Sequence, residues 1–142
     1  MMGILLGLFL LAHGLIHLSY LAPAPSPGAG RPEWPFDMAN SWLVTSLGMS
    51  ADLVRPLGTL LVVVVAATLG AAGLATLGVL VPQEWWRTLV IAGAFVSAVT
   101  LAIFFHPWVV LGFVIDGVLL YFGVVQGWQP FGAGGVSGAG GG

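Results

Sequence analysis

The chain has 142 residues, of which 58% are hydrophobic and only 6% are charged, and its formal net charge is -2. Soluble domains carry roughly 25% charged residues, so this composition excludes a water-exposed globular domain and a disordered chain. Nucleic-acid binding needs a basic face, and the three Arg residues, with no Lys, do not supply one. Because the chain contains no Cys, disulfide frameworks, thiolate metal sites and thiol nucleophiles are also excluded. The class that remains is an integral membrane protein.

Four long apolar stretches predict four membrane-spanning helices, because about 20 apolar residues in a helix cross a hydrocarbon core of about 30 Å. They cover residues 3–21, 56–81, 85–105 and 108–128. The strands of a membrane barrel would alternate polar and apolar residues, whereas these stretches are apolar on all sides. We therefore expect an all-α integral membrane protein in which residues 1–131 form one four-helix bundle, followed by a disordered glycine-rich tail at 132–142.

Proline residues mark the ends of the expected helices. Pro56 suits the first turn of the second helix, where a missing N–H costs nothing, and Pro82 ends that helix. Pro107 holds His106 out of helical geometry and opens the fourth helix. A very tight hairpin is therefore expected between the third and fourth helices.

The one long connection, residues 22–55, divides into two parts. Residues 23–35 are rich in Pro, Gly and Ser, so we expect an extended segment there. Residues 40–53 combine apolar and polar side chains in a way that predicts a short helix lying in the membrane interface.

Two pairs of opposite charges stand at the mouths of helices. Asp52 and Arg55 are three residues apart at the start of the second helix, and Glu84 and Arg87 repeat that spacing at the start of the third. Side chains at this spacing are neighbours on a helix surface, so each pair predicts an interfacial salt bridge.

Small residues recur at four-residue spacing in the second and third stretches. Such spacing lets helix backbones approach closely in lipid, where no hydrophobic effect drives helices together. The residues are Ala66 with Gly70; Ala67, Ala71 and Ala75; and Ala94, Ala98 and Ala102. Packing within the bundle is the first interpretation, and a surface for another membrane subunit is the alternative.

Three ionisable side chains lie inside the expected spans, where such groups are expensive and indicate a function. His13 and His17 are four residues apart and share one face of the first helix, and Asp116 lies in the middle of the fourth. At a rise of about 1.5 Å per residue, His13 and Asp116 both lie about 12 Å below the same membrane surface. We therefore predict that His13 and Asp116 pair. His106, His17, His13 and Asp116 would then descend in a row from that surface to mid-membrane.

Three interpretations of this row stay open. The first is a buried polar clamp that sets helix register and does no chemistry. The second is cofactor ligation, because a neutral imidazole binds haem iron, chlorophyll-type magnesium or another metal. His13, His17 and His106 are then the candidate cofactor ligands, and His106 or another chain must help, because two His on one helix cannot clamp a haem from both faces. The third is handling of protons or a quinone.

The run from Ala12 to Leu18, Ala-His-Gly-Leu-Ile-His-Leu, resembles the opening of small uncharacterised four-helix bacterial membrane proteins with an N-terminal His-Gly-Leu-Ile-His segment. The Trp85-Trp86 pair before the third span is also similar. More distantly, the architecture is similar to DoxX-like four-helix proteins, some of which are implied to work with quinone or thiol redox partners. The longer Pro-rich first loop and the glycine tail depart from these proteins. The resemblance implies the fold and carries over no catalytic residue.

These observations together predict a multi-pass protein of the bacterial cytoplasmic membrane with both ends on one side. Its parts outside the helices are too small for a soluble active site, so we expect a non-enzymatic accessory or structural subunit of a larger membrane complex. Its partners would be lipid and other membrane subunits or copies of itself. The alternative is a redox or proton-handling protein that binds haem, a pigment, a metal or a quinone through His13, His17 and Asp116.

Overall fold

The computed structural model describes residues 1–25 and 34–125, and the regular structure of these residues is helical throughout. Four helical segments are long and apolar enough to cross a membrane: Met2–Leu21, Ala51–Leu77, Gln83–Ile103 and Pro107–Val125. The predicted fold class, four transmembrane helices packed together, is therefore confirmed. The predicted glycine-rich tail, the end of the fourth span beyond Val125 and residues 26–33 of the predicted extended segment lie outside the described residues.

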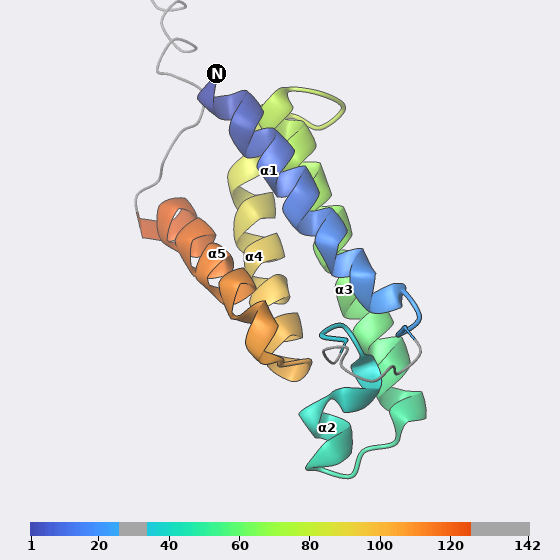
Figure 1. Ribbon diagram of the computed structural model, residues 1–142. Coiled ribbons are helices and arrows are strands. Elements are labelled where there is room, and N and C mark those ends of the chain that lie inside the picture. Colours follow the sequence, from blue (N-terminus) through green and yellow to red (C-terminus); the bar gives the residue numbers. More distant parts are fainter. Residues whose placement is uncertain (26–33, 126–142) are drawn as a thin grey trace, which may run out of the picture.

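The four segments pack in chain order (Figure 1). Helix α1 (Met2–Ile16) continues as a 3-10 turn (His17–Leu21) and packs on α3 (Ala51–Leu77). Helix α3 in turn packs on α4 (Trp86–Ile103), and α4 packs on α5 (Val110–Leu120), which ends in a π-helical turn (Tyr121–Val125). Helices α1 and α5 are thus the outer pair, with few direct backbone contacts between them.

Glycine allows the close crossing of α1 and α3. A Cβ atom added to Gly73 would lie 2.7 Å from the carbonyl oxygen of Gly7, and one added to Gly14 would lie 3.2 Å from the Cβ of Leu69. Contact at this distance between two backbones leaves no room for any side chain. The small residues at this crossing therefore act in packing within the bundle.

The second span differs from its prediction at both ends. It begins at Ala51 rather than Pro56, because the Ser50 hydroxyl caps the helix by accepting a hydrogen bond from the Asp52 N–H. Pro56 consequently lies inside the helix, where it removes one backbone donor. The helix ends at Leu77 rather than residue 81, because Gly78 adopts a left-handed φ of 70° and closes the last turn.

The short helix predicted at residues 40–53 is present as a single turn, α2 (Trp42–Thr45). The segment is fastened to the end of α4 by two hydrogen bonds. The Ser41 hydroxyl donates to the carbonyl of Ile103 at 2.8 Å, and the Trp42 indole donates to the carbonyl of Ala102 at 2.8 Å. These bonds fold the first loop back over one end of the bundle.

The tight hairpin predicted between the third and fourth spans is observed. Helix α4 ends at Ile103, and a 3-10 turn, Pro107–Val109, leads into α5. The His106 imidazole caps this turn by accepting a hydrogen bond from the Trp108 N–H at 3.2 Å. The connection is short, so α4 and α5 run antiparallel side by side.

Candidate functional site

Four polar side chains from three helices meet in the interior of the bundle. The Nε2 atom of His13 lies 3.0 Å from Asp116 Oδ1, and the Ser97 hydroxyl donates to Asp116 Oδ2 at 2.6 Å. The Nε2 atom of His17 lies 2.9 Å from the same Ser97 oxygen. We call these four residues the polar cluster. It forms one continuous hydrogen-bonded chain, His13–Asp116–Ser97–His17.

Burial makes this chain of hydrogen bonds energetically important. Ser97 and Asp116 are 0% exposed, His17 is 3% exposed and His13 is 7% exposed. Polar groups removed from water are costly unless they are paired, and each hydrogen bond here satisfies a group that lipid and protein would otherwise leave unpaired.

Local geometry on α1 aims both imidazoles at the same place. The four-residue spacing puts His13 and His17 one above the other, with ring centroids 5.4 Å apart and ring planes at 83°. The Phe9 ring stacks parallel to His13 at 5.9 Å on its other side. The His13 ring is thus held between two aromatic neighbours while its Nε2 atom reaches Asp116.

The structure brings together His13 and Asp116, the two residues expected to pair, and adds one partner that the sequence reasoning missed. Ser97 and Asp116 are nearly equally distant along the chain from the His106–Pro107 turn, so antiparallel α4 and α5 place them at the same depth. The sequence signal for this partner is a hydroxyl side chain in the middle of an apolar span, at the same depth as the Asp116 carboxylate in the next span. Ser97 bridges Asp116 to His17, and His17 makes no direct hydrogen bond to Asp116.

The order of the hydrogen bonds sets the tautomer of His17. Ser97 has one hydroxyl proton and donates it to Asp116, so its oxygen can only accept from His17. The His17 Nε2 atom must therefore carry a proton. In a neutral imidazole the Nδ1 atom then carries none and presents a lone pair, and this Nδ1 atom is buried with no hydrogen-bond partner.

A cavity of about 150 Å³ lies between α1 and α5, and His17 is one of the residues that line it. His13 and His17 line it together with Tyr20, Trp108 and Ile115. Typical small-molecule sites measure about 300–1,000 Å³, so this cavity has room for a single ring or a small head group. A separate, almost wholly apolar cavity of about 230 Å³ lies between the other halves of the same two helices.

Metal or haem ligation fits these residues poorly. Within residues 1–25 and 34–125, no group of three or more His, Asp or Glu side chains is arranged to hold a metal ion. His106 stands apart from the polar cluster, at the hairpin, where its Nδ1 atom accepts from Trp108. His13 and His17 project from one helix, so they cannot ligate a haem from both faces.

The prediction of salt bridges between Asp52 and Arg55 and between Glu84 and Arg87 is wrong. In the part of the chain that the structure describes, the one ion pair within 4.0 Å is His13–Asp116. The Arg87 side chain instead donates from Nε to the carbonyl of Gly123 at 2.7 Å, so it joins α4 to the last turn of the fourth span.

In comparisons with known proteins, no family model, no curated protein and no solved structure matches the chain. The resemblance to His-Gly-Leu-Ile-His membrane proteins and to DoxX-like proteins therefore stays a prediction. The geometry of the polar cluster and its cavity carries the functional argument alone.

Proposed function

We propose that this protein is a multi-pass membrane protein that binds the hydroxyl-bearing ring of a lipophilic hydroquinone between α1 and α5. The observation that carries the proposal is the buried Nδ1 atom of His17, which has no partner and belongs to a residue lining the 150 Å³ cavity. The lone pair on this atom can accept a hydrogen bond from the hydroxyl group of a quinol. The carbonyl oxygen of a quinone has no proton to donate to it.

The position of the cavity favours a ligand that arrives through lipid. Three of its lining residues, Ile16, Trp108 and Leu111, are 55%, 72% and 68% exposed on the outer surface of the helices. The cavity thus opens sideways between α1 and α5, toward the region that acyl chains occupy in a bilayer. A ring carried on an apolar tail can enter from there with its tail left in the lipid.

The polar cluster supports the same interpretation. Asp116 fixes the Ser97 hydroxyl, and Ser97 fixes the protonated side of His17, so the acceptor on the other side of the ring is oriented before a ligand binds. Preorganised polar groups in an apolar pocket are the usual means of orienting a small ligand.

The test compares two substitutions that keep different halves of the imidazole. His17→Gln places an amide near Nε2 and keeps the bond to Ser97, whereas His17→Asn places an acceptor near Nδ1. A short-chain benzoquinol and its quinone are dialysed separately against nanodiscs that contain the protein and against empty nanodiscs. His106→Gln is the matched control, since it removes an imidazole outside the cavity.

We expect the quinol to bind more tightly than the quinone. Loss of one buried hydrogen bond costs about 1–2 kcal/mol, so His17→Gln should weaken quinol binding roughly tenfold while His17→Asn and His106→Gln keep most of it. Equal partition of the quinol into protein-containing and empty nanodiscs would falsify the proposal, as would unchanged binding by His17→Gln.

As a second proposal, the protein is an accessory subunit of a larger membrane complex. We also propose that it lies in the bacterial cytoplasmic membrane with both chain ends on one side. One observation favours a partner: a Cβ atom added to Gly70 on α3 would meet none of the described residues within 4 Å, so the side-chain face of this small residue has room for a neighbouring subunit, although its backbone packs against Gly14. Co-purification of other membrane proteins from native membranes tests this role. It is supported if a Gly70→Leu variant loses a co-purifying subunit, and it fails if the wild-type protein is recovered alone.

A further inference from the structure

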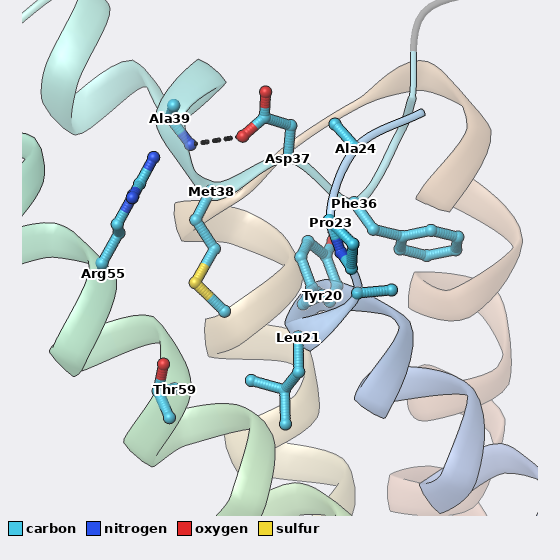
Figure 2. Close-up of a pocket in the computed structure, with 11 residues that line it drawn as sticks. Tyr20, Leu21, Pro23, Ala24, Phe36, Asp37, Met38, Ala39, Arg55 and Thr59 are labelled. Atoms are coloured by element: carbon cyan, nitrogen blue, oxygen red, sulfur yellow. Dashed lines mark hydrogen bonds between the residues drawn. The ribbon is translucent and has the colours of Figure 1, made fainter. Parts of the chain in front are cut away.

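A larger cavity of about 470 Å³ lies at the end of the bundle over which the first loop folds. Its walls come from the end of the first span, from residues 36–39 and from the beginning of α3 (Figure 2). The side chains that matter here are Leu21, Phe36, Asp37, Met38, Arg55 and Thr59. The volume falls within the range of about 300–1,000 Å³ that is usual for small-molecule sites.

Two side chains of opposite charge that have no ion-pair partner among the described residues line this cavity. Arg55 and Asp37 both line it, yet within the described residues neither forms an ion pair within 4.0 Å, with the other or with Asp52. Figure 2 shows the two side chains on opposite sides of Met38. Asp37 Oδ1 accepts the Ala39 N–H at 2.9 Å, and its other carboxylate oxygen has no partner among the described residues.

In a bilayer crossed by the four candidate spans, this cavity lies at the level of the head groups. Arg55 is in the second turn of α3, and Leu21 is the last residue of the first span, so the charged rim stands at the boundary between hydrocarbon and water. The apolar side chains of Leu21, Phe36 and Met38 also line the cavity. A ligand that fits carries both charges at one end and an apolar body at the other.

We infer that this cavity binds the head group of a phospholipid with a primary ammonium, that is, a phosphoethanolamine lipid. The Arg55 guanidinium binds the phosphate, with the Thr59 hydroxyl one helical turn below as a further donor. The Asp37 carboxylate accepts from the ammonium, and the acyl chains leave along the apolar wall into the bilayer. An anionic glycerol lipid lacks the cation that Asp37 requires, and a choline lipid lacks N–H donors.

This inference does not depend on the quinol proposal. The two cavities share Tyr20 and Phe36 as walls, but Arg55 and Asp37 line only the interfacial cavity, and His17 lines only the intramembrane one. Variants of Arg55 and Asp37 therefore report on lipid binding while leaving the polar cluster unchanged.

The experiment measures which lipids the full-length protein retains. The detergent-purified protein is exposed to equal amounts of phosphatidylethanolamine, its mono- and dimethyl derivatives, phosphatidylcholine and phosphatidylglycerol, and the bound lipid is counted by native mass spectrometry. We expect retention to fall stepwise as methyl groups replace the N–H donors, with phosphatidylethanolamine favoured about fivefold to tenfold over phosphatidylcholine. Free phosphoethanolamine, added as a competitor, separates recognition of the head group alone from recognition of the whole lipid.

Two conservative variants assign the contacts. Arg55→Gln should reduce retention of every phospholipid, whereas Asp37→Asn keeps an acceptor for the Ala39 N–H and should abolish only the preference for ethanolamine over choline. Asp52→Asn, on α3 but outside the cavity, is the matched control, and helical content by circular dichroism verifies that each variant folds. Equal retention of all head groups by the wild-type protein overturns the inference, and so does an Arg55→Gln variant that retains lipid as the wild-type protein does.

Discussion

Replacing Ser97 with Ala tests whether the polar cluster holds the bundle together. The substitution removes a hydroxyl of 0% exposure that donates to Asp116 at 2.6 Å and accepts from His17 at 2.9 Å. It leaves both ring nitrogens of His17 without a partner and removes one of the two donors that Asp116 has. No large cavity is created, because only one oxygen atom is lost.

The magnitude follows from the two bonds that are lost. Hydrogen bonds between membrane helices average about 0.6 kcal/mol and reach about 1.7 kcal/mol, and bonds to charged groups lie near the upper end. Two such bonds, one of them to a carboxylate, give an expected loss of about 2 kcal/mol in the free energy of unfolding. Thr100→Val is the matched control, since Thr100 is on the same helix, is also 0% exposed, and donates only to the Val96 carbonyl of its own helix.

Unfolding is followed by circular dichroism while the mole fraction of sodium dodecyl sulfate in mixed micelles is raised. We expect Thr100→Val to lose less than about 1 kcal/mol, because a bond within one helix is not needed to join helices. If Ser97→Ala and Thr100→Val lose the same stability, the hydrogen bonds between helices are not what stabilises this interior, and the reasoning fails.

Two further predictions concern packing and the first loop. Gly73→Ala places a Cβ atom 2.7 Å from the carbonyl oxygen of Gly7, so we expect a loss of about 1–3 kcal/mol in the same unfolding assay. Gly70→Ala, where a Cβ meets nothing within 4 Å, should leave stability almost unchanged; a similar loss at both positions would contradict the crossing geometry. Ser41→Ala removes the hydroxyl that donates to Ile103 at 2.8 Å, and proteolysis between α2 and α3 should become faster while the midpoint of bundle unfolding moves little. An unchanged cleavage rate would show that this bond does not fasten the loop.

Composition and length were sufficient for the number of helices. A run of about 20 apolar residues can satisfy its backbone in lipid only as a helix, so hydropathy alone predicts the four spans. The His13–Asp116 pair was also within reach, since helical rise turns sequence position into depth. The position of Pro56 predicts too late a start for α3, whereas the Ser50 cap, which is equally visible in the sequence, decides where the helix begins.

The tertiary structure alone decided which side chains meet and which space they leave. The depth of a residue can be counted along its helix, but the rotation of the helix and the identity of its neighbours depend on how all four helices pack. The sequence therefore indicates the depth of Ser97 but not its contact with His17. The cavity between α1 and α5 exists because these two helices touch little, which no local pattern encodes. The lack of a hydrogen-bond partner for the His17 Nδ1 atom is likewise a property of the assembled bundle. Hydropathy is a property of one segment, whereas the partners of a buried atom depend on every helix around it.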